Sequence, residues 1–212
     1  HFMEIAFPAR DLPAMGYRSY SLARSVTPGT ATGASGDGKG VLENELLRVK
    51  IDQPSGSIVS LVDKATGYEF VPCGGKLGLL EYTLEAPDGM SAWVVHQYLE
   101  QEALDTGWHL ACPARGPHVA NAVLTRKYKD STLTLVISLA AGMRRVDFDL
   151  RVDWLERGSR QIGIPGLKVH FPVNVKADSA TFECPNGFVE RPNDGHEVPS
   201  QKWMDLTGTG EG

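Results

Sequence analysis

The sequence predicts an all-β protein built as a large antiparallel two-sheet sandwich. About a dozen strand candidates follow one another between turn residues, at the spacing typical of a sandwich. The clearest of them alternate apolar and polar residues, which is the period of a strand with one buried face. Almost no segment shows the period of an amphipathic helix.

The composition is that of an ordinary globular chain. Its 212 residues suffice for one large β domain, and 42% are hydrophobic while 22% are charged. The net charge is −5, and no Lys/Arg cluster offers the footprint of a nucleic-acid binder. No apolar run approaches the roughly 18 residues of a membrane span. We therefore expect neither nucleic acid nor membrane as a partner.

The N-terminal part is expected to lead into the domain. Residues 1–26 are interpreted as a linker strand, with residues 1–2 a cloning remnant ahead of Met3. Residues 27–40 hold five glycines and no large apolar side chain, which predicts a flexible loop. The β-sandwich is then expected over residues 41–212, as a piece of a longer enzyme.

Residues 41–71 predict a three-strand meander. Apolar and polar residues alternate along 47–52, as in a half-buried strand. Residues 54–56 (Pro-Ser-Gly) predict a turn, because proline presets φ and glycine tolerates a positive φ. Ile58, Val59, Leu61 and Val62 place apolar side chains on both faces, which indicates a central strand, and residues 68–71 return.

Longer strands follow. Residues 76–85 and 92–96 are strand-like, and residues 118–128 and 132–139 predict a hairpin. Residues 143–154 alternate well, with Asp147 and Asp149 on the polar face. This pair could mimic the carboxylates of a glycosidase, but a retaining pair flanks the glycosidic bond from two sides. The pattern favours a solvated face balanced by Arg145 and Arg151.

Several motifs resemble the C-terminal β domain of family 38 glycoside hydrolases, the retaining α-mannosidases, in their bacterial type. Residues 12–22 (LPAMGYRSYSL), 41–71 and 92–96 (AWVVH) resemble its opening strands. Residues 154–173, from Trp-Leu-Glu to LKVHFPV, resemble a later strand pair. The most specific match is an ordered set of unusual residues: Glu183, Gly187, Arg191-Pro192, Val198-Pro199 and Trp203.

The resemblance implies a fold and an activity. It implies a supersandwich similar to galactose mutarotase, belonging to an enzyme that cleaves α-mannosides. It also implies Zn²⁺, an Asp nucleophile and a carboxylic acid/base, all in a preceding N-terminal catalytic domain. Nothing here corresponds to those groups, so we expect no catalytic residue, metal ligand or cofactor in this chain, which would be inactive alone. Its partners would be its own catalytic domain and the carbohydrate substrate.

Three residues are candidates for the rim of the sugar site. Arg191 can bracket sugar hydroxyls, or form a structural ion pair with Glu190, Glu183 or Asp194. Trp203 can stack on a sugar face, or pack in a core or interface. Glu183 can contact the substrate, or serve as a hydrogen-bonded carboxylate at the end of a strand.

Two other functions stay open. An autonomous carbohydrate-binding, lectin-like module would need exposed aromatic residues on one sheet face. A mutarotase-like epimerase would need a His acid paired with a Glu base, for which His96 or His170 with Glu183 are the candidates.

The cysteines indicate a cellular compartment. Cys73, Cys112 and Cys184 form an odd, sparse set without metal-binding spacing. Free thiols of this kind suit a reducing environment, so we expect a cytoplasmic protein.

Overall fold

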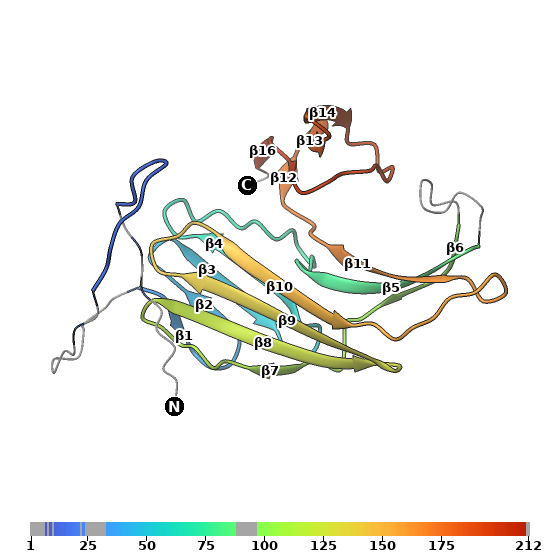
Figure 1. The fold of residues 1–212 in the computed structure, drawn as a ribbon, viewed down its shortest axis with the longest axis horizontal. Helices are drawn as coiled ribbons and strands as arrows, with labels where there is room; N and C mark the ends of the chain where they lie inside the picture. The colour runs from blue at the N-terminus through green and yellow to red at the C-terminus, as the bar shows by residue number, and fades with distance from the viewer. Residues whose placement is uncertain are drawn as a thin grey trace.

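The structure is a computed structural model that describes residues 7, 9, 11–21, 23, 33–87 and 97–210. The described residues form sixteen strands and no helix, and all strand pairs are antiparallel. No helix long and apolar enough to cross a membrane therefore occurs among them. The all-β antiparallel prediction is confirmed, and Figure 1 shows the strands arranged in layers.

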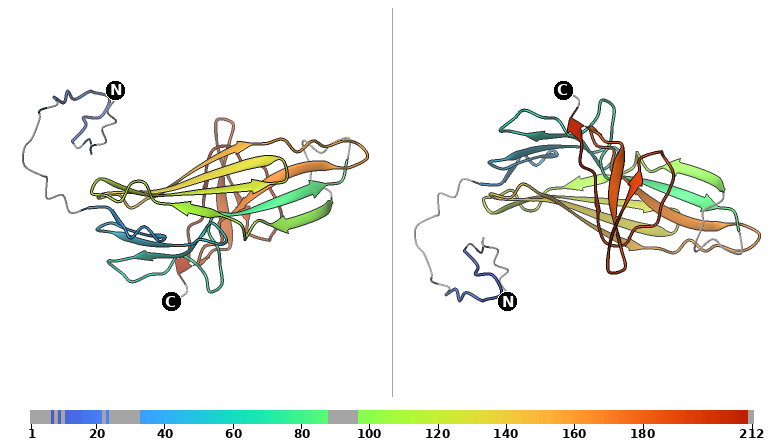
Figure 2. Two further views of the ribbon diagram at one scale, coloured as in Figure 1. Left: turned by 90° about the horizontal axis from the view of Figure 1, so that it is seen from below. Right: turned by 90° about the horizontal axis from the view of Figure 1, so that it is seen from above.

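Two four-stranded sheets form the main body. The first has the order β1-β2-β3-β4, with bounds Ser35–Gly36, Val41–Glu43, Leu47–Asp52 and Ser57–Asp63. The second has the order β10-β9-β8-β7, with bounds Val146–Asp153, Ser131–Ala140, Val119–Tyr128 and His109–Ala111. The two sheets lie one over the other (Figure 2), as expected for a sandwich.

The core lies between these sheets, because each strand turns one apolar face inward. Along β3 every second residue from Leu47 to Ile51 is buried, as the alternation predicts. In the β8–β9 hairpin, Ala122 pairs with Ile137 and Leu124 with Leu135, so their buried side chains share a face.

The remaining strands extend the body. A third sheet has the order β11-β5-β6, with bounds Ile164–His170, Leu79–Glu85 and Tyr98–Ala103. Residues 175–210, here called the C-terminal arm, add β12 (Val175–Lys176) paired with β16 (Thr209–Gly210). The arm also contains a three-stranded sheet of order β14-β13-β15, with bounds Gly187–Pro192, Ser179–Cys184 and Met204–Asp205. Figure 1 shows the arm above the sandwich, where it follows β11.

Some local expectations differ from the structure. The return segment of the meander, residues 68–71, is a single bridge from Glu69 to Val62 and not a full strand. Residues 17–21 carry no strand, and residues 92–96 lie outside the described residues. Residues 33–40 of the expected flexible loop are held by contacts with the body. β1 pairs with β2, and the buried Ala34 donates its N–H to the carbonyl of Pro117 at 2.8 Å.

Candidate functional site

The C-terminal arm carries all three candidate residues, and its small sheet sets their relative positions. β13 is the central strand: β14 pairs along its whole length, and β15 pairs on its other side. The turn between β13 and β14 contains Asn186 with φ 64°, a conformation that asparagine tolerates better than most residues. The connection from β14 to β15, residues 193–203, is here called the arm loop.

Glu183 lies near the end of β13 and acts as a hydrogen-bonded carboxylate. Its backbone N–H donates to the carbonyl of Trp203 at 3.1 Å, and its Oε2 accepts from the N–H of Lys202 at 2.6 Å. The other oxygen, Oε1, has no hydrogen-bond partner among the described residues. Glu183 therefore fastens the end of the arm loop and leaves one acceptor available.

Arg191 does not form the ion pair that the sequence suggested. Its Nη1 donates to the carbonyl of Pro199 at 2.7 Å, and its guanidinium carbon lies 5.6 Å from the centre of the Phe182 ring. Neighbouring Glu190 points to the opposite face of the strand, where it accepts from the Ser179 hydroxyl. Asp194 instead lies 3.0 Å from His196.

Trp203 does not lie in a core, since 43% of it is exposed. The β13–β15 register, Phe182 with Met204, places Trp203 opposite Glu183. On the other side of β13, Glu183 pairs with Phe188, which is 70% exposed. Directly paired residues share a sheet face, so these residues form a cross-strand row of two exposed aromatics around a carboxylate.

Sequence analysis did not select Phe188. The available signal was the alternation along residues 187–191, which assigns Phe188 and Val189 to opposite faces. The sequence alone does not show which of these faces the protein leaves uncovered.

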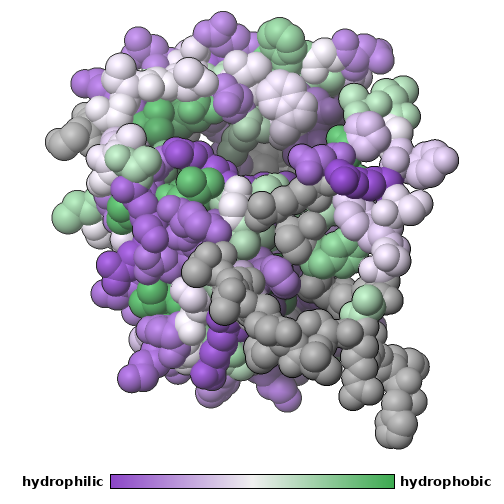
Figure 3. Space-filling view, turned by 90° about the vertical axis from the view of Figure 1, so that its left-hand side faces the viewer, coloured by the Kyte–Doolittle hydropathy of each residue, from purple (hydrophilic) through white to green (hydrophobic). Residues whose placement is uncertain are grey.

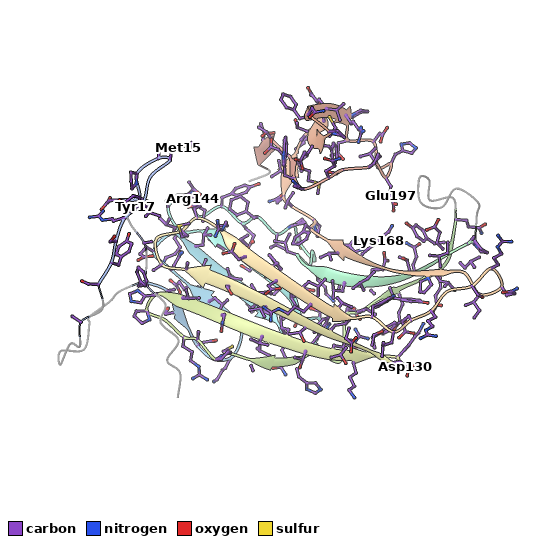
Figure 4. All side chains as sticks on the ribbon, in the orientation of Figure 1. Met15, Tyr17, Asp130, Arg144, Lys168 and Glu197 are labelled. Atoms are coloured by element: carbon purple, nitrogen blue, oxygen red, sulfur yellow. The ribbon has the colours of Figure 1, made fainter. Side chains whose placement is uncertain are left out.

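The arm loop is fastened to the body through Glu197. Its carboxylate forms an ion pair with Lys168 on β11 and accepts from the hydroxyl of Tyr98 on β6 at 3.1 and 3.2 Å. Lys168 Nζ also lies 4.1 Å from the centre of the Tyr98 ring. Figure 4 shows Glu197 reaching from the arm toward Lys168. The hydrogen bond from Lys168 holds the pKa of Glu197 below its ordinary value.

The residues suggested for an epimerase are not brought together. His170 on β11 lies 3.0 Å from Glu81 on β5, whereas Glu183 bonds to the arm loop. His96 lies outside the described residues.

The two aspartates on β10 have the structural role that the sequence favoured. Asp147 pairs with Arg145 at 2.7 Å, and Asp149 pairs with Arg151 at 2.7 Å, all with exposed side chains. The hydrogen bond from Arg151 lowers the pKa of Asp149. These ion pairs balance the solvated strand face.

Among the described residues, neither a metal-binding cluster nor the apolar groove between the sheets coincides with the three candidate residues. In the part of the chain that the structure describes, no group of three or more His, Cys, Asp and Glu residues is placed to hold a metal ion. An apolar groove of about 370 Å³ opens between the sheets beside Phe70, Phe148 and Phe171. None of the three candidate residues lines it. Seen from the end that lies at the left in Figure 1, hydrophobic residues form separate patches between hydrophilic ones (Figure 3).

Comparison with known proteins gives a consistent result. Residues 42–212 match the sequence model of the glycosyl hydrolases family 38 C-terminal domain. The chain is 30% identical over 188 residues to alpha-mannosidase 2C1 of Homo sapiens, covering 83% of this chain and 17% of that protein. It is 28% identical over 183 residues to the Mus musculus protein of that name, covering 81% of this chain and 17% of that protein.

Two solved structures share the fold. A glycosyl hydrolase family 38 protein from Enterococcus faecalis superposes with a TM-score of 0.66 at 16% identity, over 87% of this chain and 25% of that one. An alpha-mannosidase from Enterococcus faecalis V583 gives a TM-score of 0.63 at 17% identity, over 85% of this chain and 23% of that one.

Proposed function

Because the chain belongs to the C-terminal domain family of family 38 glycosyl hydrolases, we propose that it is the non-catalytic β domain of a retaining, zinc-dependent α-mannosidase. The whole enzyme that contains this chain, here called the parent, would hydrolyse α-mannosidic bonds. The observation that carries the proposal is the family match over residues 42–212, together with relatives named alpha-mannosidase. This chain spans 17% of those relatives, which leaves ample length for a catalytic domain.

Zinc would be bound outside the residues that the structure describes. A catalytic zinc ion needs three protein ligands that converge on one point. The described histidines and carboxylates offer no such donor set. When bound elsewhere in the parent, zinc would polarise or clamp oxygen ligands of the substrate.

The contacts of three charged residues at the candidate site support a structural role for this domain. Glu183 accepts a hydrogen bond from the N–H of Lys202. Glu197 forms an ion pair with Lys168 and accepts a hydrogen bond from the Tyr98 hydroxyl. Arg191 donates a hydrogen bond to the carbonyl of Pro199. The arm loop is thereby fastened at three points, which suits a loop that packs on the catalytic domain and lines the rim of its sugar site.

The test is hydrolysis of a chromogenic α-mannoside by the purified parent. We expect activity that is lost on chelation and returns with added Zn²⁺, whereas the 212-residue chain alone stays inactive. If the parent is folded and contains zinc but does not hydrolyse α-mannosides, the proposal is refuted.

An autonomous carbohydrate-binding module is the second candidate. The exposed Phe188 and Trp203 around Glu183 favour it, because aromatic rings and carboxylates bind sugar faces and hydroxyls. Calorimetric titration of the isolated chain with mannose and α-mannosides tests it. A dissociation constant in the micromolar range would favour the carbohydrate-binding module over the non-catalytic mannosidase domain.

We also propose a cytoplasmic location. The three cysteines are free, and Cys112 is buried, so the fold does not rely on a disulfide among them. Fractionation of the source cells, with detection of the parent, tests this proposal.

A further inference from the structure

A hollow of about 520 Å³ lies beside the end of β11, away from the three candidate residues of the arm. One wall is the loop that leads into β5, and the other is the end of β11 with the residues that follow it. The N–H of Gly78 donates to the carbonyl of His170 at 2.7 Å, so the two walls are bonded to each other. The loop wall carries no side chain at Gly74 and Gly75, which leaves its backbone open to a small ligand.

Two ion pairs supply the polar side chains of the hollow. Lys76 lies on the loop wall, and its Nζ is 3.2 Å from Oδ2 of Asp105. His170 lies on the β11 wall, and its Nε2 is 3.0 Å from Oε2 of Glu81. Leu79 is the register partner of His170, so Glu81, two residues further along β5, shares that sheet face. Each lining side chain is therefore held in position by a carboxylate.

These pairs leave donors and acceptors unused among the described residues. Lys76 Nζ forms one of its three possible hydrogen bonds, and Nδ1 of His170 forms none. Oδ1 of Asp105 and Oε1 of Glu81 have no hydrogen-bond partner there either. A sugar hydroxyl both donates and accepts, so it suits a site that offers both kinds of group. Because both pairs contain a carboxylate, the hollow offers no net positive charge to an anion.

Phe171 adds an apolar wall beside these polar groups. It is 44% exposed, and its ring packs edge-to-face on Phe148 with the ring centres 5.1 Å apart. This contact holds the ring, so little conformational entropy is lost when a ligand packs on it. An aromatic ring binds the apolar face of a sugar while polar groups bind its hydroxyls. The combination indicates a neutral ligand with a hydroxylated ring.

Two other hollows lack this combination. One, of about 440 Å³, contains Glu156 and Arg160 but no aromatic side chain. The apolar groove between the sheets is lined by three phenylalanines, but its polar side chains are two arginines, which offer no acceptor. The chemistry of the hollow beside β11 is therefore not shared by these two surfaces.

We infer that this hollow, here called the β11 site, is a subsite that binds a neutral hexose through Lys76, His170 and Phe171. The inference rests on the proposed function for the choice of mannose as the hexose. A hexose has about a dozen non-hydrogen atoms, and an open hollow surrounds it only in part. We therefore expect a dissociation constant of about 1–10 mM.

Hydrogen–deuterium exchange of the parent and of the 212-residue chain, with and without mannose, tests the inference. At about ten times the expected dissociation constant, peptides over residues 72–79 and 168–172 should exchange up to about tenfold more slowly in both proteins. Peptides from the β8–β9 hairpin serve as the reference and should not change. Unchanged exchange at the β11 site in both proteins would overturn the inference. Protection in the isolated chain alone would also overturn it, because the rest of the parent would then cover the hollow.

Matched variants separate binding from a general effect of sugar on exchange. Lys76→Met removes the donors but keeps an unbranched side chain, and it should raise the dissociation constant about fivefold or more. His170→Ala, at an exposed residue, is a second variant with the same expected effect. Lys127→Met, at an exposed lysine on β8, is the matched control and should leave the protection unchanged. Melting curves confirm that each variant is folded, and protection that survives both β11-site variants would overturn the inference.

Other outcomes have distinct meanings. Protection of the β11 site by inorganic phosphate and not by mannose would identify an anion site and overturn the inference. Protection confined to residues 183–188 and 202–204 would place mannose at Phe188 and Trp203 and would also overturn it. Mannosidase activity of the parent is measured separately: an active parent without protection of the β11 site refutes only the subsite, whereas an inactive parent with that protection refutes only the activity.

Discussion

Lys168 and Glu197 form an ion pair that joins two parts of the chain 29 residues apart. Lys168 belongs to β11 of the third sheet, and Glu197 belongs to the arm loop. This contact also involves the Tyr98 hydroxyl and ring, so the loop is bound to two neighbouring elements of the body. This polar contact therefore helps to hold the arm against the body.

Glu197→Gln should loosen the arm loop, because an uncharged amide cannot form the ion pair with Lys168. We expect faster amide exchange over residues 193–203 in the 212-residue chain, with no change in the β8–β9 hairpin. Asp194→Asn is the matched control, because its carboxylate pairs with His196 inside the same loop. Wild-type exchange rates in the Glu197 variant would show that other contacts hold the loop.

Acid should have a similar effect on the wild-type chain. The hydrogen bond from Lys168 keeps the folded pKa of Glu197 below the ordinary value of 4.5. A carboxyl with a depressed folded pKa stabilises the folded state above its unfolded pKa, and this contribution is lost as pH falls from there through the folded value. Amide NMR spectra recorded below pH 4.5 should therefore show the loop signals shifting, and Glu197→Gln should remove that titration.

Asn44 should be the costliest buried polar residue to replace. It is 2% exposed, and its Nδ2 donates to the carbonyls of Ala140 and Met143 at 2.7 and 2.8 Å. Its Oδ1 accepts from the N–H groups of Leu46 and Leu47. Asn44→Ala leaves these groups unsatisfied between the two sheets, so we expect a loss of about 2–4 kcal/mol in urea unfolding.

The control for that substitution is Asn193→Ala. Asn193 is exposed, and its side-chain Nδ2 donates at 3.2 Å to the carbonyl of Ala177. Its replacement should change the free energy of unfolding by no more than about 0.5 kcal/mol. Equal losses at both positions would contradict the bridging role of Asn44.

Ile137→Ala should destabilise the sandwich by about 2–5 kcal/mol, because it opens a cavity in the packed face of β9. Ile137 is 0% exposed, whereas Ile162 is 60% exposed. Ile162→Ala removes the same atoms from a solvated site and should cost little. Denaturant unfolding of both variants checks the difference, and a small loss at Ile137 would mean that the sheets close over the cavity.

Tyr128 should make the chain sensitive to alkali. Burial, together with the hydrogen bond that its hydroxyl donates to Glu102 at 2.7 Å, raises its pKa well above the ordinary value of 10.0. A raised folded pKa gives a contribution to stability that is complete below pH 10.0 and is lost as pH rises through the folded value. Tyr128→Phe should flatten the fall in stability above pH 10, measured by urea unfolding at a series of pH values.

Tyr17→Phe is the control, since this ring is largely exposed. It should leave the alkaline fall in stability unchanged. An unchanged fall in the Tyr128 variant would show that other groups cause it.

The sequence by itself determined the strands and much of the sandwich. The alternation over residues 132–139 and 143–154 set which side chains of β9 and β10 face the core, because strand periodicity is local. The same locality explains the pairs of Asp147 with Arg145 and of Asp149 with Arg151, whose members are two residues apart. The ordered motif from Glu183 to Trp203 also indicated the family.

Only the tertiary structure decided what the candidate residues do. The arm loop carries the chain past β13, so Trp203 comes to lie opposite Glu183, and Phe188 lies on the other side. The contact between Glu197 and Lys168 has the same cause. Glu197 lies on the arm loop, which connects β14 and β15, two strands that are not neighbours in the sheet. Such pairings depend on strand order and register over long separations, which local periodicity does not encode.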